Sequence, residues 1–356
     1  TAMPPLTWLV LGDKLGDNAQ VELIADALGW PFERKSLVFL PQFRTGNPRF
    51  RPTLSHLDRD LSAALEAPWP DLIITIGRRP SMAALAVREL SGNRSRVVMI
   101  GRPRRLPELG LGVVTPQYSV PAADNVMHLD YPLMKIDTDA ILAEKSAHAA
   151  SMSRLPRPLT AVLVGGSTSP FVLDVEAAKQ LLAQTRKCCV GGTNYLSTSR
   201  RTDAAVVDYL AATLREDERL YRWQPDDPDN PYLGLLAHAD RVVVTCDSIS
   251  MMMEAARLGK PLAIFEVPTL FTPSQKTRRR MARALDPTVG GNQRFLRWLY
   301  TAGPMSFPRD LGRMQRALVA EGIAVPLGEP FPPPHAGLPD ESQAVAARIR
   351  ALFQSQ

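Results

Sequence analysis

A glycine-rich loop in the second half of the chain has the residue types of a phosphate-binding turn. Its members are Gly165, Gly166, Ser167 and Thr168, and they follow an apolar run at 160–164 that we expect to be a buried strand. Glycines let a backbone approach a ligand closely, and hydroxyls with free N–H groups can hold phosphate oxygens. Because Gly-Gly-Ser also forms ordinary turns, the loop predicts either a phosphate contact or a turn alone.

A second polar loop carries two adjacent arginines. Ser199, Arg200 and Arg201 lie just before Thr202, at a predicted junction between a strand and a helix. Guanidinium groups at such a junction can make bidentate contacts with phosphate oxygens. The structural alternative is that Thr202 caps the helix and the arginines are simply exposed.

A third loop begins at Thr245 and runs into a helix. Ser248 or Ser250 can cap this helix, whose N-terminus favours an anion. Glu254 follows one turn after Ser250 and could accept hydrogen bonds from ribose hydroxyls. The alternative is a capping box that ends at Glu254, but it requires Ser or Thr where Met251 stands, so it fits imperfectly.

The segment at 12–18 in the first half combines glycines, two carboxylates and a lysine. Asp17 or Asp13 could take a proton from an acceptor hydroxyl as a general base. The alternative for Asp17 is the N-cap of the first helix. The other candidate residues on this acceptor side are Gly12, Lys14, Gly16 and Asn18, together with Arg78 and Arg79 at the start of a later helix.

Several motifs of well-known enzyme classes are absent from the sequence. There is no GxGxxG fingerprint, no GxxxxGK[ST] loop and no GxSxG elbow, which argues against an NAD dehydrogenase, a P-loop enzyme and an α/β-hydrolase. The five histidines are scattered without ligand spacing, and the three cysteines have no zinc spacing. We therefore expect no metal and no cofactor.

Short apolar runs alternate with helical patterns along the chain, which predicts an α/β fold with parallel sheets. The expected strands are 7–12, 35–40, 71–77, 97–101, 113–114 and 126–129, then 160–164, 187–191, 219–223, 240–245 and 262–265, with a helix expected at 53–65 among others. We place an N-terminal Rossmann-like domain at 1–152, a C-terminal Rossmann-like domain at 158–328, and a Pro-rich loop with a final helix at 329–356.

The formal net charge of +6 favours anionic partners such as nucleotides, phosphorylated sugars or acidic lipid surfaces. Arginine clusters at 102–105 and 278–280 either contact such partners or form solvated faces. No helix-turn-helix signature or platform of aromatic and basic residues stands out, so we expect no nucleic-acid partner.

Three cysteines, an odd number, suit a reducing compartment. No apolar run approaches the ~20 residues of a membrane span, and no signal-peptide pattern is visible. These features predict a cytoplasmic chain, with peripheral attachment to the inner face of the cytoplasmic membrane left open.

The polar loops together resemble the mitochondrial-fission "elongated mitochondria" family of plants and many bacteria. The matching stretches are GDKLGDNAQ (12–20), PDLIITIGRRP (70–80), VLVGGST (162–168), STSRRT (197–202) and TCDSISMMMEAARLGKP (245–261). That family is similar to GT-B glycosyltransferases, which implies two Rossmann-like domains facing across a cleft, with a nucleotide sugar held by the C-terminal one.

The resemblance also implies a role for each loop. Gly166 and Ser167 would face the diphosphate with Ser248 and Ser250 nearby, Glu254 would bind the ribose, and the 12–18 loop with Arg78 and Arg79 would face the acceptor. By the same analogy, the final helix at 341–356 would cross back to the first domain.

Two functions follow. The first is a metal-independent glycosyltransferase that moves a sugar from a nucleotide diphosphate sugar to an acceptor hydroxyl, on a lipid or a cell-envelope glycan. The second is a non-catalytic protein that keeps the fold and binds nucleotides or partners. If Asp13 and Asp17 point away from a cleft and bind only backbone, the first function loses support.

Overall fold

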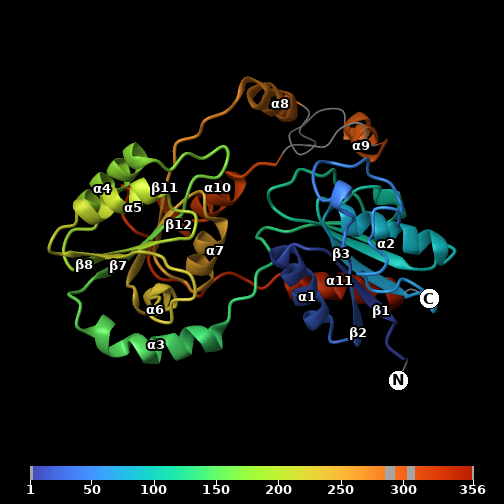
Figure 1. The fold of residues 1–356 in the computed structure, drawn as a ribbon, viewed down its shortest axis with the longest axis horizontal. Coiled ribbons are helices and arrows are strands. Elements are labelled where there is room, and N and C mark those ends of the chain that lie inside the picture. The colour runs from blue at the N-terminus through green and yellow to red at the C-terminus, as the bar shows by residue number, and fades with distance from the viewer. Residues whose placement is uncertain (1–2, 285–292, 303–308, 355–356) are drawn as a thin grey trace. The chain divides into compact units, whose positions relative to one another are not determined.

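The computed structural model describes residues 3–284, 293–302 and 309–354. The chain divides into two compact units (Figure 1). Unit 1 comprises Thr1–Lys135, Arg279–Asp310 and Asp340–Gln356, and unit 2 comprises Ile136–Arg278 and Leu311–Pro339. Each contains a parallel six-stranded sheet, which confirms the predicted α/β class with two Rossmann-like domains.

The order in which the chain adds strands to the sheet of unit 1 reverses at β1. Its order is β2 (Phe32–Ser36), β1 (Thr7–Leu11), β3 (Leu72–Ile76), β4 (Arg96–Gly101), β5 (Leu111–Val114) and β6 (Val126–His128). The chain passes from β1 to β2 on one side and then to β3 on the other side of β1. In open parallel sheets, ligands bind beyond the strand carboxyl ends at such a switch in order.

Both faces of this sheet are covered, which explains why all five residues of β1, TWLVL, are buried and four of them are apolar. Alternate residues point to opposite faces: Trp8 and Val10 pack in a core with α2 (Arg78–Leu90), while Leu9 packs with α1 (Leu15–Leu28).

The final helix α11 (Ser342–Gln354) belongs to unit 1 and packs against α1, as predicted (Figure 1). The Nη2 atom of Arg350 donates to the carbonyl oxygens of Ala27 and Leu28 at 2.8 and 3.1 Å. These carbonyls end α1 without helical partners, so Arg350 satisfies the last turn of the helix it packs against.

The sheet of unit 2 has the strand order of dinucleotide-binding folds. Read in the chain's own sequence of strands the order is 3-2-1-4-5-6: β9 (Glu218–Tyr221), β8 (Thr193–Thr198), β7 (Leu159–Val164), β10 (Arg241–Thr245), β11 (Leu262–Phe265) and β12 (Ala324–Pro326). The switch lies between β7 and β10, so the loops after these two strands leave the sheet side by side.

The helices of unit 2 lie on both sides of its sheet (Figure 1). Its helices are α3 (Thr138–Ser153), α4 (Val175–Cys188), α5 (Ala204–Ala212), α6 (Tyr232–His238), α7 (Ile249–Arg257) and α10 (Arg313–Ala320). Because α3 packs against α6, the chain enters unit 2 after Lys135, earlier than the sequence-based boundary at 152. Two further helices, α8 (Pro273–Ala284) and α9 (Gln293–Ala302), follow β11.

Three predicted elements are wrong. The helix expected at 53–65 is a series of turns, and the strand expected at 187–191 is the end of α4 followed by a glycine turn. The strand that pairs with β7 is β8, in a stretch the sequence analysis treated as a loop. The second strand covers Phe32–Ser36 rather than 35–40.

Candidate functional site

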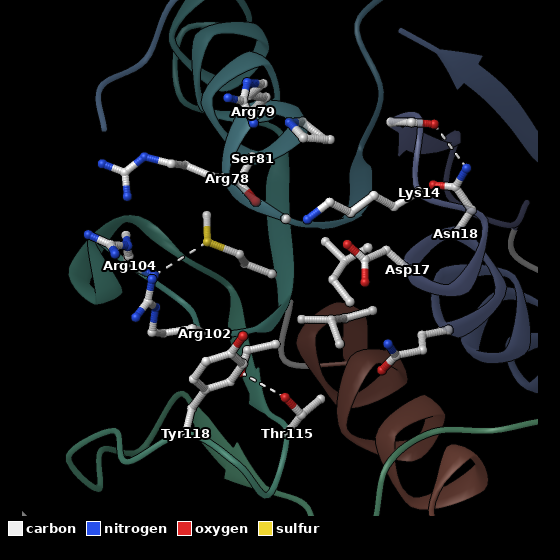
Figure 2. A pocket seen from close by; sticks show the side chains of 18 of the residues that line it. Lys14, Asp17, Asn18, Arg78, Arg79, Ser81, Arg102, Arg104, Thr115 and Tyr118 are labelled. Atoms are coloured by element: carbon white, nitrogen blue, oxygen red, sulfur yellow. Dashed lines mark hydrogen bonds between the residues drawn. The ribbon is translucent and has the colours of Figure 1, made fainter. Parts of the chain in front are cut away.

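A cavity of about 330 Å³ opens in unit 1 at the carboxyl ends of β1, β3, β4 and β5. Its position matches the switch point of the sheet. Its polar lining includes Asp13, Lys14, Asp17, Asn18, Arg78, Arg79, Arg102, Arg104 and Tyr118 (Figure 2). The predicted acceptor-side residues are therefore brought together in one pocket, except Gly16, which does not line it.

The first turn of α1 forms one side of the pocket. Lys14 is the N-cap residue, and no side chain caps the helix. Asp17 lies inside the first turn, so its alternative role as N-cap is wrong. Asn18 has a structural contact, since its Nδ2 donates to the carbonyl oxygen of Gly12 at 3.0 Å. Gly12 itself lies against Pro80, where an added Cβ would be 2.9 Å from Cγ.

Asp17 occupies an unusual electrostatic position for an aspartate. Burial raises the pKa of its carboxyl above the ordinary value, Lys14 and Arg309 act in the opposite direction, and Asp13 raises it further. Its carboxylate points into the pocket (Figure 2). A half-buried carboxylate with a raised pKa is a stronger base than an exposed one and is suited to proton transfer.

The two arginines that begin α2 have different roles. Arg79 donates to the carbonyl oxygens of Phe43 and Gly46, the second at 2.9 Å, so it holds the 43–46 turn in place. Arg78 donates from Nε to the carbonyl of Pro48 at 2.6 Å. Arg78 is thereby fixed at the pocket wall by one bond, whereas Arg79 is more fully used by the fold.

Arg102 and Arg104 also line the pocket. From the sequence, their cluster could either contact an anionic partner or form a solvated face. They follow the carboxyl end of β4 and stand with Arg78 on the side of the pocket opposite Lys14 and Asp17 (Figure 2). Burial, and after it the charges of Arg102 and Arg78, lowers the pKa of Arg104 to about 10. Burial and the charge of Arg102 lower the pKa of Arg78 in the same way. Their position just after a strand was the signal in the sequence.

In unit 2, the loops after β7, β8 and β10 are joined by hydrogen bonds. The N–H of Gly166 donates to Oδ2 of Asp247 at 2.9 Å, and Nη2 of Arg201 lies 3.1 Å from the same oxygen. The hydroxyl of Thr202 donates to the carbonyl oxygen of Gly165 at 2.6 Å. Asp247 was not among the predicted site residues, and its side chain is fully buried.

The two glycines of the first loop have a packing reason for their type. A Cβ added at Gly165 would lie 2.1 Å from Oδ2 of Asp247, and one at Gly166 would lie 1.9 Å from the carbonyl oxygen of Arg201. The neighbouring loops therefore leave no room for a side chain at either position. Ser167 and Thr168 also bond internally: Ser167 Oγ accepts from the N–H of Leu173 at 3.0 Å.

The second loop is ordered by its own hydroxyls. Thr202 Oγ1 accepts from the N–H of Ser199 at 2.9 Å, and the N-cap residue of α5 is Asp203, so the capping role considered for Thr202 is wrong. Arg201 also donates to the hydroxyl of Thr168. Arg200 is exposed.

The third loop leads into the N-terminus of α7, and this helix carries the carboxylate of Glu254. Ser248 is the N-cap residue of α7, without a side-chain capping bond, and Ser250 is exposed in the first turn. Glu254 accepts a hydrogen bond from the hydroxyl of Tyr232, which replaces the capping box as its structural contact. Burial raises the pKa of Glu254, and the Tyr232 hydrogen bond acts against that rise.

Within the described ranges, no group of three or more His, Cys, Asp or Glu residues could hold a metal ion. No helix among the residues with described structure is long and apolar enough to cross a membrane.

The chain thus has two Rossmann-like units, a basic pocket in one and a set of joined polar loops in the other. Residues 16–288 match the family described as mitochondrial fission ELM1, and the chain belongs to this family. This confirms the resemblance found from the loop motifs.

Two relatives show how far the likeness extends. The mitochondrial fission protein ELM1 of Arabidopsis thaliana is 28% identical over 225 residues, which are 56% of this chain and 52% of the plant protein. The match thus spans about half the length of that relative. An uncharacterized protein of Rickettsia prowazekii is 26% identical over 300 residues, 73% of this chain and 83% of that protein.

Solved structures similar to this chain are more distant. UDP-GlcNAc 2-epimerase from Methanocaldococcus jannaschii has a TM-score of 0.48 at 11% identity and covers 98% of this chain and 99% of its own. Arabidopsis thaliana UGT89C1 complexed with UDP has a TM-score of 0.43 at 11% identity, with 99% of both chains covered. ADP-heptose lipopolysaccharide heptosyltransferase II of Escherichia coli has a TM-score of 0.38 at 15% identity and covers 89% of this chain and 99% of its own.

Proposed function

We propose that this chain is a metal-independent GT-B-type glycosyltransferase that moves a sugar from a nucleotide diphosphate sugar to an acceptor hydroxyl. The observation that carries the proposal is the placement of Asp17. This carboxylate lines the pocket of unit 1, is not used as a helix cap, and has a pKa raised by burial. Asp13 lines the same pocket and is a second candidate for this role.

In the proposed reaction, the acceptor hydroxyl lies in the unit 1 pocket and Asp17 accepts its proton. The hydroxyl oxygen forms a bond to the anomeric carbon of the donor as the bond from that carbon to the diphosphate breaks. The electron pair of the broken bond leaves with the nucleoside diphosphate. A positioned general base contributes about 10²–10⁴-fold to such a step.

We assign the donor to the loops of unit 2. The strand order there and the joined loops after β7, β8 and β10 support this assignment. Arg200, Arg201 and the N-terminus of α7 would stabilise the charge on the leaving diphosphate in place of a metal. Glu254, fixed by Tyr232, would accept hydrogen bonds from the ribose.

A peripheral membrane site is part of the proposal, because a lipid-linked acceptor must be reached at a surface. The helix α9 supports it: Phe295 and Trp298 are 50% and 59% exposed and stack with ring centroids 6.1 Å apart. Phenylalanine and tryptophan are the side chains with which amphipathic helices enter the headgroup region of a bilayer.

A non-catalytic nucleotide- or partner-binding function is the alternative, and one observation favours it. Ser167, Thr168 and Arg201 already bond to other parts of unit 2. If these contacts hold the loops closed to a diphosphate, the fold is retained without donor chemistry.

A thermal-shift screen with nucleoside diphosphates and their sugars at millimolar concentration tests the donor site. A ligand that binds only the folded state raises the unfolding midpoint. We expect one nucleotide class to raise the midpoint of the wild type, and Glu254→Gln and Arg201→Lys to reduce that shift, while Glu176→Gln, at an exposed position on α4, leaves it unchanged. A panel without any shift would contradict both the enzymatic function and nucleotide binding.

A further inference from the structure

The unit 1 pocket carries far more positive than negative charge. Six cationic side chains line it, from Lys14, Arg78, Arg79, Arg102, Arg104 and Arg309, against the two carboxylates of Asp13 and Asp17. Loss of solvent, and after it the repulsion between neighbouring arginines, lowers the pKa values of Arg78 and Arg104. An anion that enters such a site relieves the repulsion and is bound favourably.

Two of the pocket arginines, Arg78 and Arg104, have no acidic partner within ion-pair distance in the part of the chain that the structure describes. The guanidinium of Arg104 instead lies over the ring of Phe50, with Cζ 5.6 Å from the ring centroid. Stacking on the aromatic face fixes the plane of the guanidinium without using its N–H groups.

Two helix N-termini add to the positive field. The helices α1 and α2 both begin at the pocket, with Lys14 and Gly77 as N-cap residues. No side chain caps either helix, so the first-turn backbone N–H groups, which Pro80 of α2 lacks, can face a ligand. Together with the arginines, they offer donors from more than one direction.

The number and direction of these donors indicate a phosphoryl group rather than a carboxylate. A carboxylate has one charge and two oxygens, whereas a phosphate ester carries close to two charges and presents three oxygens, each a strong acceptor. The cavity of about 330 Å³ is near the lower limit for small-molecule sites, so it suits a phosphoryl group with one sugar-sized group attached.

We propose that the unit 1 pocket binds the phosphoryl group of a phosphorylated acceptor, with Arg78, Arg102 and Arg104 as its cradle. The acceptor role rests on the proposed function, but the binding does not. The ionised carboxylate of Asp17 repels a phosphate, and it stands on the other side of the pocket from the three arginines (Figure 2). The phosphoryl group therefore lies on the arginine side, and the hydroxyl that reacts lies toward Asp17.

The test measures binding of inorganic phosphate and pyrophosphate to the full chain by calorimetry at low and moderate salt. We expect binding by the wild type that weakens as salt rises, at least tenfold weaker binding by Arg104→Gln, and an intermediate loss for Arg104→Lys, which keeps the charge but not the planar fork. Arg94→Gln is the matched control. Arg94 is exposed and precedes the amino end of β4, whereas Arg102 follows its carboxyl end, so this variant should bind as the wild type does.

Two results would overturn the proposal: no binding of either anion by the wild type, or equal losses in Arg104→Gln and Arg94→Gln. Unfolding midpoints without ligand check that each variant is folded. A variant that fails to fold is replaced by Arg102→Gln, at another residue of the proposed cradle, with the same expected weakening.

Two further arms identify the source of the phosphoryl group. Vesicles with phosphatidic acid represent a lipid headgroup, and glucose 1-phosphate represents a soluble sugar phosphate. Binding that depends on Arg104 in one arm assigns that source and supports the proposal. Phosphate binding without sugar transfer would retain this inference and reject the enzymatic function. Sugar transfer that is changed neither by added phosphate nor by Arg104→Gln would support the enzymatic function and reject the phosphoryl site.

Discussion

Arg201 and Asp247 form an ion pair that joins the loop after β8 to the loop after β10, with Nη2 and Oδ2 3.1 Å apart. The same Asp247 oxygen accepts the N–H of Gly166 from the loop after β7. One fully buried carboxylate thus connects all three loops to which we assign the donor. Because a buried charge requires a partner, the arrangement makes the loops depend on one another.

The first prediction concerns the loss of this partner. Arg201→Ala leaves the Asp247 carboxylate without its cation, and we expect the free energy of unfolding to fall by about 1–2 kcal/mol, since Arg201 is itself partly exposed. Urea denaturation measures it. The exposed neighbour provides the control, because Arg200→Ala should change stability by less than about 0.5 kcal/mol. Equal stability of the two variants would show that the ion pair contributes nothing.

The second prediction concerns the glycines of the first loop. In Gly166→Ala, the new Cβ meets the carbonyl oxygen of Arg201 at 1.9 Å, so the loops must separate and stability should fall by about 1–3 kcal/mol. Gly16→Ala is the opposite case, because a Cβ there meets nothing within 4 Å and the residue lies within α1. Alanine should therefore stabilise this helix by about 0.5–1 kcal/mol. Thermal unfolding measures the stability of both variants. A lower midpoint for Gly166→Ala and a higher one for Gly16→Ala would show that Gly166 is required for close packing and Gly16 is not.

The third prediction follows from the raised pKa of Asp17. In the unfolded chain this carboxyl titrates near 3.8, and in the folded protein it titrates at higher pH. The folded state therefore binds more protons between the two values, and the free energy of unfolding falls as pH rises through that window. Asp17→Asn removes this loss, so the variant should be more stable than the wild type at pH 7 and equal to it below pH 3.8.

Unfolding by urea at several pH values measures the difference. Asp13→Asn, at an exposed carboxylate of the same pocket, serves as the comparison. A stability difference between Asp17→Asn and the wild type that does not change with pH would mean that burial of the Asp17 charge is not its cause.

The fourth prediction concerns α9. Replacing Trp298 by alanine removes an exposed aromatic side chain that we expect to enter a bilayer, and binding to vesicles with anionic lipids should weaken about tenfold. Leu61→Ala is the control, since Leu61 is 66% exposed in unit 1 but lies outside α9. Co-sedimentation with vesicles measures both. If Leu61→Ala weakens binding as much as Trp298→Ala, α9 has no special role at a membrane.

Much of the fold was predictable because both sheets are covered on both faces. Buried parallel strands such as β3 are continuous apolar runs, which the sequence shows directly. The strand β8 escaped detection because it buries polar residues, among them Thr193, Asn194 and Ser197, and therefore has no apolar run.

The helix wrongly expected at 53–65 shows a different limit. Leu54, Leu57 and Leu61 have helical spacing, but the carboxylate of Asp58 accepts the N–H groups of Asp60 and Leu61. These local bonds compete with the helical ones, so the segment forms turns. Periodicity reports the hydrophobic pattern and not this competition.

The candidate site was partly predictable for a geometric reason. Carboxyl ends of parallel strands meet at one edge, so polar loops that each follow a strand come together, as the hydrogen bonds between the loops after β7, β8 and β10 show. The burial of Asp247 could not be predicted, because it depends on how closely Gly165 lets the loops approach. The arginine side of the pocket likewise depends on Phe50, which is distant in sequence from Arg104.

The most direct test of the proposed function is the release of nucleoside diphosphate by the wild type and by Asp17→Asn. Both are incubated with each nucleotide sugar that raises the unfolding midpoint, with and without a phosphorylated acceptor. We expect release that the acceptor accelerates and that Asp17→Asn slows by about 10²–10⁴-fold, with nucleotide binding unchanged. Equal rates for the two proteins would contradict the role of Asp17, and binding without any release would contradict the glycosyltransferase itself.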